Sequence, residues 1–176
     1  MLTLSLLRHA KSSWAEPGID DHERPLAKRG AKAAPEIGTY LRRERLRPDL
    51  VLCSGAVRAR ATLAMVLAEL GPPAPEVRYD DALYLATPAV MLGLLRRIDA
   101  AHRPPYRHVM VVGHNPGLHA LALELIGEGS RKDIAEVATK FPTAALAVLA
   151  IDAASWSEIG AASARLERFL TPRRLT

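Results

Sequence analysis

The sequence predicts an α/β protein, a three-layer α/β/α sandwich built around a mostly parallel central sheet. Short apolar runs that indicate buried strands alternate along the chain with longer stretches whose apolar residues recur at helical spacing. Three of the apolar runs end in a polar cluster, as strands do where they lead into a loop at the edge of an open sheet. This alternation is typical of parallel strands that are covered by helices on both faces.

The first half of the chain begins this alternation at its N-terminus. The elements expected there are a strand at 2–8, a helix at 26–45, a strand at 49–53, a helix at 56–70 and a weak extended stretch at 77–83. Pro35 lies inside the first helix, where it removes a backbone donor and crowds the preceding turn, so we expect a kink or a break. The run Gly71-Pro72-Pro73 ends the second helix.

The second half continues the pattern. Thr87 and Pro88 are suited to cap and open a helix, and Asn115 and Pro116 repeat this pair of roles further along the chain. The elements expected there are a helix at 88–101, a strand at 108–113, a helix at 116–127, and strands at 144–151 and 165–170. Residues 128–142 are the least regular part of the sequence, and we expect a mobile loop there.

Length and composition are those of one ordinary globular domain that spans residues 1–176. Apolar residues make up 49% of the chain and charged residues 24%, which is enough for a core without disulfides. The single cysteine, Cys53, excludes a disulfide framework, and no apolar run reaches the roughly 18 residues of a membrane span. The N-terminal run lacks the charged start and the cleavage site of a secretion signal, so we expect a cytoplasmic protein with no membrane partner.

The net charge of +5 suits an acidic or phosphorylated partner. Aromatic residues are only 5% of the chain and are not interleaved with the basic runs. Because single-stranded nucleic acids are bound by aromatic rings set among basic residues, we expect no nucleic-acid partner.

Several enzyme classes lack their sequence signals. A cysteine phosphatase needs five residues between its cysteine and its arginine, whereas four residues separate Cys53 from Arg58 and six separate it from Arg60. No Gly-rich phosphate loop with a Lys-Ser/Thr pair is present, and His114 and His119 do not have the spacing of zinc ligands. We therefore expect no metal and no cofactor.

Histidine and arginine side chains follow three of the predicted strands. Arg8 and His9 end the first strand, Arg58 begins the helix after the second strand, and His114 ends a later strand. Because ligands of open α/β sheets bind beyond the carboxyl ends of the strands, we expect these side chains to share one crevice. Two guanidinium groups and two imidazoles match the needs of a phosphate dianion.

Four ordered segments carry a family resemblance. The segments LLRHAKSSW, DHERPLAKRG, LCSGAVRARAT and VVGHNPGL resemble, in order and spacing, the histidine phosphatase superfamily, and within it the small SixA-like phosphohistidine phosphatases. The match runs from Leu4 to about Leu118. Ala10 stands where the family usually has the glycine of an Arg-His-Gly motif. The resemblance implies a phosphoglycerate-mutase-like fold and a phosphatase that works through a phosphohistidine intermediate.

We expect His9 to be the nucleophile, a role that the resemblance also implies, because a neutral histidine can accept a phosphoryl group and split one displacement into two steps. Neighbouring arginines lower the pKa of an imidazole and keep it neutral. Arg8 and Arg58 would clamp the phosphate oxygens, and His114 would donate a hydrogen bond, or bring a positive charge, to those oxygens in the transition state. Ser54 and the backbone around it would add donors to the same phosphate-binding site.

The remaining site residues are less clearly marked. Arg24 resembles a family position before the helix and is expected either to anchor its loop or to line the pocket rim, and Lys11 is a second rim candidate. For the general acid that an ester substrate needs, Asp81 is our first choice, and a turn or cap role fits it equally well. Glu76 and Asp80 are the other carboxylates nearby.

A phosphorylated protein, such as a histidine-phosphotransfer domain, is the expected substrate and partner. The imidazole leaving group of phosphohistidine needs less help from an acid than an ester does. The alternatives are a small-molecule phosphomonoesterase or a phosphoglycerate-mutase-like enzyme, and, in a different class, a basic module that binds a phosphoprotein or nucleic acid without turnover. The oligomeric state stays open. No site role is expected for the other histidines, His22, His102, His108 and His119.

Overall fold

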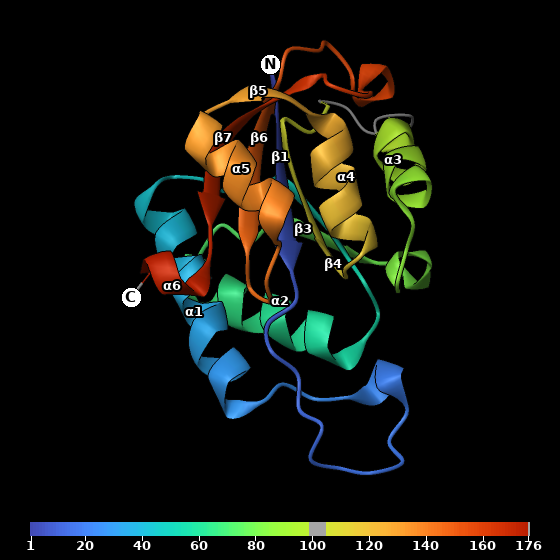
Figure 1. Cartoon of the computed structure of the whole chain (residues 1–176), viewed down its shortest axis with the longest axis vertical. Coiled ribbons are helices and arrows are strands. Elements are labelled where there is room, and N and C mark those ends of the chain that lie inside the picture. The colour runs from blue at the N-terminus through green and yellow to red at the C-terminus, as the bar shows by residue number, and fades with distance from the viewer. Residues whose placement is uncertain (99–104, 176) are drawn as a thin grey trace.

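The computed structural model describes residues 1–98 and 105–175, and one seven-stranded sheet runs through the middle of it (Figure 1). The strands are β1 (Leu2–Arg8), β2 (Leu50–Cys53), β3 (Glu76–Tyr79), β4 (His108–Gly113), β5 (Ile126–Gly129), β6 (Leu146–Ile151) and β7 (Ala164–Leu170). The helices are α1 (Lys28–Arg43), α2 (Val57–Leu70), α3 (Pro88–Arg97), α4 (Gly117–Leu125), α5 (Arg131–Thr139) and α6 (Pro172–Leu175). Short 3₁₀ turns at Asp21–Glu23, Asp81–Leu83 and Trp156–Glu158 lie in the connections.

The strands are arranged in the order β3-β2-β4-β1-β6-β7-β5. β1 to β4 pair with one another in parallel, and β5 pairs in parallel with β7. β6 is antiparallel to both of its neighbours, β1 and β7, so it runs against the other six strands. The sheet is therefore mostly parallel and is covered by helices, as the alternating pattern of the sequence predicts.

Alternate side chains of the sheet enter two separate cores. In β1, Leu4 and Leu6 belong to one core and Leu7 belongs to the other, and β2 and β4 alternate in the same way. α1 and α2 cover one face of the sheet, while α3, α4 and α5 cover the opposite face (Figure 1). Because both faces are buried in the middle of the sheet, the strands there need apolar residues on both sides, which explains the nearly continuous apolar sequences of β2, β4 and β6.

The three neighbouring strands β2, β4 and β1 bring three chain segments to one edge of the sheet. β4 lies between the other two, with Val112 opposite Cys53 and Gly113 opposite Arg8. The residues that follow these strands therefore emerge next to one another. The long connection between β1 and α1 lies beyond this edge (Figure 1).

Pro35 neither splits nor ends α1, so the expected break is absent. The helix continues past the proline, and Ile37 and Leu41 after it are fully buried. Gly38 lets α1 approach the backbone of Val66 in α2, where a side chain would collide with the Val66 carbonyl. Packing between the two helices outweighs the one backbone hydrogen bond that the proline removes.

The segment 128–142 is largely regular, so the prediction of a mobile loop there was wrong. Part of β5 and the whole of α5 lie in it. Val137 of α5 is buried, and Ile134 packs against the same core. These are the only two large apolar residues in the nine of α5, which is too few for a clear helical pattern in the sequence.

α4 begins one residue later than expected and lacks the predicted cap. Asn115 Oδ1, the atom that would accept a helix N–H, is buried without a hydrogen-bond partner among the described residues, while Nδ2 donates to the Phe141 carbonyl at 2.8 Å. Pro116 is the N-cap residue and Gly117 is the first residue of the helix. The partner of Asn115 is distant in sequence, so the local pattern gave no sign of it.

Two further expectations concern residues 77–101. The weak extended stretch expected at 77–83 only overlaps with β3, which begins one residue earlier, at Glu76, and ends at Tyr79. Thr87 caps α3 as predicted, since its Oγ1 accepts a hydrogen bond from the Val90 N–H at 3.4 Å. The predicted end of that helix near residue 101 lies outside the described residues. In the described part of the chain, no helix combines the length and the apolar character that crossing a bilayer requires.

Candidate active site

His9 follows β1, and His114 follows the neighbouring β4. The His9 N–H donates to the Gly113 carbonyl at 3.1 Å, which continues the β1–β4 ladder and keeps the two histidines side by side. Their ring centroids are 5.1 Å apart, and both side chains are buried. Adjacent strand ends thus bring two imidazoles to one place.

The His9 ring is oriented by its own backbone. Its Nδ1 lies 2.7 Å from the Ala10 carbonyl, an acceptor, so Nδ1 carries the proton and Nε2 keeps the lone pair. Nε2 lies 3.4 Å from the Nε of Arg58. Burial, together with the charges of Arg58 and Arg8, lowers the pKa of His9 to about 4. His9 is therefore neutral at pH 7, and its unprotonated nitrogen is the one that faces the arginine.

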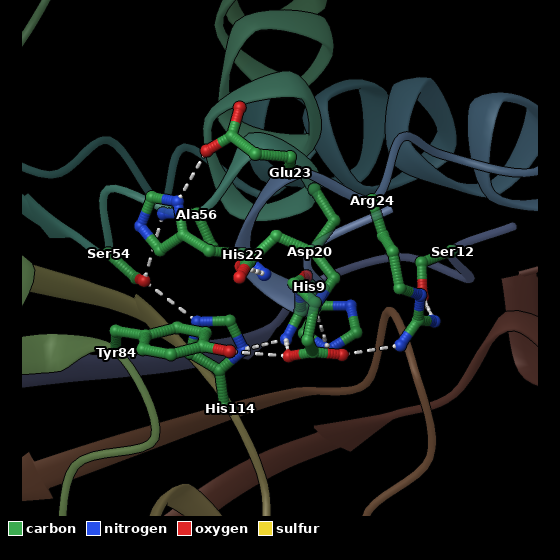
Figure 2. A network of polar contacts seen from close by, with 12 residues as sticks. His9, Ser12, Asp20, His22, Glu23, Arg24, Ser54, Ala56, Tyr84 and His114 are labelled. Atoms are coloured by element: carbon green, nitrogen blue, oxygen red, sulfur yellow. Dashed lines mark hydrogen bonds and ion pairs between the residues drawn. The ribbon is translucent and has the colours of Figure 1, made fainter. Parts of the chain in front are cut away.

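Ser54 holds the His114 ring through Nε2, the ring nitrogen on the side away from Arg58. Ser54 is fully buried, and its Oγ lies 2.7 Å from His114 Nε2 (Figure 2). The same oxygen accepts the Ala56 N–H at 3.3 Å. The Ser54 side chain does not line the cavity described below, which contradicts the expectation that it contacts phosphate. Its position instead makes it an anchor for the His114 ring.

His114 is also a neutral imidazole. Burial is the largest cause, followed by repulsion from the His9 ring when that ring is protonated and by the charge of Arg58, and together they lower the pKa of His114 to about 3. Its Nδ1, on the far side of the ring from Ser54, lies 3.4 Å from Arg58 Nη2. This nitrogen is the one available to a bound anion.

Arg58 links both histidines to the connection after β1. It lies in the first turn of α2, and its Nη1 and Nη2 donate to the carbonyl of Asp21 at 2.5 Å and to its carboxylate at 3.0 Å. Thr62, one turn later, accepts the Ala10 N–H at 2.9 Å. The start of α2 therefore holds both the guanidinium group and the backbone that follows His9.

Asp21 is a site residue to which the sequence pattern assigned no role. Its carboxylate accepts hydrogen bonds from Tyr84 Oη at 2.5 Å, Arg24 Nη1 at 2.7 Å and Arg58 Nη2 at 3.0 Å. The Tyr84 hydrogen bond and the two arginines lower the pKa of Asp21 to about 2, although desolvation opposes the shift. The available signal was its place three residues before Arg24 in the segment DHERPLAKRG, which carries part of the family resemblance.

Arg8 and Arg24 complete a cluster of cations. Arg8 Nη1 donates to the Phe141 carbonyl at 2.9 Å, and its buried Nε has no hydrogen-bond partner among the described residues. Arg24 Nε donates to the Ser13 carbonyl at 3.0 Å, and its Nη2 donates to Ser12 Oγ (Figure 2). Arg24 thus anchors the connection after β1 and also lines the cavity, which combines the two alternatives that the sequence left open.

These side chains surround an open cavity of about 440 Å³. Its lining residues are Arg8, His9, Lys11, Ser12, Trp14, Asp21, Arg24, Arg58, Leu85, His114, Asn115 and Thr143. The lining therefore holds four cationic side chains and one carboxylate, a net charge of +3 while both histidines are neutral. A cavity with this charge attracts and holds a dianion. Lys11, which was expected at the pocket rim, is among the lining residues.

Asp81 lies outside this cavity. Its side chain is 89% exposed, and its carboxylate is 4.0 Å from His22 Nε2. The expected general acid therefore faces solvent instead of the cavity. Tyr84, from the end of the same 3₁₀ turn, is the side chain that reaches into the polar network.

The other described histidines also lie outside the cavity. His108 is buried in the sheet, with Nε2 2.8 Å from Ser5 Oγ, and neither His22 nor His119 lines the cavity. His102 lies outside the described residues. Across residues 1–98 and 105–175, no three His, Cys, Asp or Glu side chains are grouped so that they could hold a metal ion.

Comparison with known sequences agrees with this geometry. The sequence profile of the histidine phosphatase superfamily (branch 1) matches residues 4–84, which contain Arg8, His9, Asp21 and Arg58. An uncharacterized protein of Mycobacterium tuberculosis (strain H37Rv) is 40% identical over 169 residues, which is 95% of this chain and all of the relative.

Solved structures give the same result. A candidate phosphohistidine phosphatase SixA from Nakamurella multipartitia is 31% identical, with a TM-score of 0.81 over 97% of this chain and 96% of that one. A candidate phosphohistidine phosphatase SixA from Agrobacterium tumefaciens is 34% identical, with a TM-score of 0.78 over 97% and 98% of the two chains. The family profile covers residues 4–84, and the two SixA structures match 97% of the chain at 31% and 34% identity, so the chain belongs to the histidine phosphatase superfamily, branch 1.

Proposed function

We propose that this phosphatase removes phosphate from phosphohistidine in a protein, and that His9 carries the phosphoryl group between two steps. The state of His9 is the observation that carries the proposal. It is a buried, neutral imidazole with Nδ1 bonded to the Ala10 carbonyl and Nε2 beside Arg58, at a cationic cavity. In this state the ring has a lone pair available for attack on phosphorus.

In the first step, Nε2 of His9 attacks the phosphorus atom, and the bond from phosphorus to the leaving group breaks. Arg8 and Arg58 hold the non-bridging oxygens, where the negative charge of the transition state is spread. His114 offers Nδ1 to one of these oxygens. A phosphate dianion beside the ring raises the pKa of His114, against the effect of burial, so that a proton is present at Nδ1 for the contact.

In the second step, water attacks the phosphorus atom and the P–N bond to His9 breaks. Inorganic phosphate leaves with both protons of that water, and His9 returns to its neutral form with its own proton still on Nδ1. The same arginines that stabilise the first transition state stabilise the second, because the phosphoryl group does not leave the cavity between the steps.

Asp21 favours a phosphoramidate substrate over a phosphate ester. Tyr84, Arg24 and Arg58 keep its carboxylate ionised, with a pKa of about 2, so it has no proton to give at neutral pH. The alkoxide of an ester needs a proton as it leaves. The ring of phosphohistidine takes a proton from water on its second nitrogen before it binds, and it then leaves as neutral imidazole without an acid from the enzyme. The similar structures described as candidate phosphohistidine phosphatases support the same substrate class.

The test compares phosphate release, with a chelator present, from a histidine-phosphorylated protein domain and from a simple aryl phosphate. We expect faster release from the phosphoprotein. The His9→Ala variant should lose turnover on both substrates while its melting curve stays cooperative. Acid-labile, alkali-stable radiolabel from the phosphoprotein should accumulate on wild-type enzyme after rapid quenching, and not on the variant.

His119→Ala is the matched control. His119 is five residues from His114 on the chain but does not line the cavity, so this variant should keep wild-type rates. If the enzyme prefers the aryl ester, the proposal is wrong and the protein is a small-molecule phosphomonoesterase. Turnover by His9→Ala would remove the proposed nucleophile.

A further inference from the structure

Two exposed apolar side chains stand at the mouth of the phosphate cavity. Trp14 is 74% exposed and Leu85 is 52% exposed, and both line the cavity whose other walls are charged or polar. They come from different segments: Trp14 from the connection after β1, and Leu85 from the segment between the 3₁₀ turn at Asp81–Leu83 and α3. We call these two side chains the apolar rim.

Trp14 is held in place despite its exposure. The Arg24 guanidinium carbon lies 3.3 Å from the centroid of the Trp14 ring, a stacked cation–π contact. Arg24 is itself bonded to the Ser13 carbonyl and to Asp21. The ring is therefore fixed to the cation cluster on one side, and the rest of its surface is open to solvent.

Leu85 is held in an unfavourable backbone conformation. Its φ is +49°, in the left-handed region where a branched side chain is disfavoured. Its exposure means that burial in this chain does not compensate for the strain. The preceding Tyr84 is bonded to Asp21 at 2.5 Å, so the polar network of the site determines where Leu85 stands. Strain of this kind is found where surrounding structure imposes a conformation that function uses.

The chemistry of the rim selects between the possible substrates. A sugar phosphate or another small polar ester presents hydroxyl groups around its phosphate, and these need polar partners, which an indole face and leucine methyls do not provide. A phosphohistidine on a folded protein is surrounded by neighbouring side chains of that protein. On an exposed helix, these neighbours are the residues one turn away on either side.

We propose that the apolar rim docks the protein surface around the phosphohistidine, and that its partner is a folded domain with apolar side chains beside that residue. The proposal rests on the proposed phosphohistidine phosphatase function. The dianion enters a cavity with a net charge of +3, while the apolar neighbours cover Trp14 and Leu85. Trp14 and Leu85 would then set affinity for the protein, and the cavity would set the chemistry.

The test measures kcat/KM of wild type, Trp14→Ala and Leu85→Ala on two substrates with the same P–N bond: a histidine-phosphorylated protein domain and phosphoramidate, which fills only the cavity. Each variant should lose at least about tenfold on the phosphoprotein, mainly through KM, which is the scale of an anchor residue in an interface. On phosphoramidate, which does not cover the exposed faces of Trp14 and Leu85, the loss of each variant should be much smaller than its loss on the phosphoprotein. Leu123→Ala, at another exposed apolar residue that does not line the cavity, is the control and should match wild type on both.

The outcomes separate this proposal from the one on which it rests. If wild type releases phosphate from the phosphoprotein and both rim variants do so equally well, the docking role is wrong and the proposed function stands. If wild type leaves the phosphoprotein intact and cleaves small esters, both proposals are wrong.

Equal losses on phosphoramidate would assign the rim to the cavity itself. A selective loss by Trp14→Ala on aryl or nucleoside phosphates would make the rim a ring-stacking subsite instead. The Leu85→Ala substitution removes none of the contacts of Arg24 named above. It therefore also controls for the release of Arg24 when Trp14 is replaced.

Discussion

At the scale of single residues, Arg58 is the side chain that connects the two histidines of the site with Asp21. Its guanidinium group lies 3.4 Å from a ring nitrogen of His9 and of His114, and it also binds Asp21. Through its charge it lowers the pKa of both imidazoles, although burial is the larger cause. One side chain therefore helps to keep the proposed nucleophile neutral and is placed to bind the phosphate that this nucleophile would attack.

Replacing Arg58 with Gln keeps a hydrogen-bond donor near the histidines and removes the charge. We expect kcat/KM on a histidine-phosphorylated domain to fall by about 10²- to 10³-fold, the scale of one preorganised contact to the transition state. The pKa of His9 should rise, because a positive neighbour no longer disfavours its protonated form. The acid limb of the pH–rate profile of the residual activity should therefore move to higher pH.

Arg60→Gln is the control for this experiment. Arg60 is an exposed arginine of the same helix, with its guanidinium carbon 5.2 Å from the Tyr79 ring centroid. This variant should keep the wild-type profile. An Arg58→Gln enzyme with an unmoved acid limb would show that the charge of Arg58 does not help to keep His9 neutral.

At the scale of elements, α1 and α2 fix the connection that carries half of the cavity. A Cβ at Gly30 in α1 would collide with the backbone of Lys11, just after β1. A Cβ at Gly38, two turns later, would collide with the backbone of Val66 in α2. Both glycines allow close approach of the backbone, but only Gly30 contacts the segment that leads to the site.

This difference yields a paired prediction. Gly30→Ala and Gly38→Ala should each destabilise the fold by about 1–3 kcal/mol, the usual cost of overpacking. Gly30→Ala should also lower kcat/KM at least tenfold, because the connection with Lys11, Trp14 and Arg24 must shift. Gly38→Ala should keep its kcat/KM per folded molecule. Urea unfolding measures the loss of stability, and kinetics below the melting temperatures of both variants measure the loss of kcat/KM. Equal losses of kcat/KM in the two variants would contradict the argument.

At the scale of the whole molecule, three buried histidines make stability depend on pH. Burial is the main cause that lowers the pKa of His9 and His108 to about 4 and that of His114 to about 3. Below pH 6.5 the unfolded chain binds protons that the folded chain does not bind. The free energy of unfolding therefore falls as the pH drops from 7 towards 4.

Urea unfolding at pH 7 and pH 5 checks this expectation. Each of the three histidines should account for a loss of roughly 2 kcal/mol between these pH values. His108→Gln, which removes a histidine from outside the cavity, should show a smaller loss than wild type. The same stability at both pH values would mean that these histidines are protonated inside the folded protein. Asp21, with a pKa of about 2, contributes a further loss only below about pH 4.

Local sequence was sufficient for the strands and for the residues that follow them. Arg8, His9 and His114 are adjacent to apolar runs, and Arg58 opens the helix after another run, so topology alone brings the four together. It was also sufficient for the Thr87 cap, because a cap depends on residues three positions apart.

Local sequence did not predict the contacts between segments that are distant along the chain. Ser54 was expected to bind phosphate, but its hydroxyl lies behind His114, sixty residues away in sequence. Asp81 was the expected acid, but the turn directs it to solvent and brings Tyr84 to Asp21 instead. In each case, the direction of a side chain depends on which segment packs next to it.

The sequence by itself determined the alternation of strands and helices, the parallel core of the sheet and the four side chains at its carboxyl edge. These follow from short-range patterns and from the way in which parallel strands are connected. Only the tertiary structure decided that Asp21 is held ionised among Tyr84, Arg24 and Arg58, and that Trp14 and Leu85 stand at the mouth of the cavity. These depend on burial and on contacts between distant segments, which no local pattern encodes.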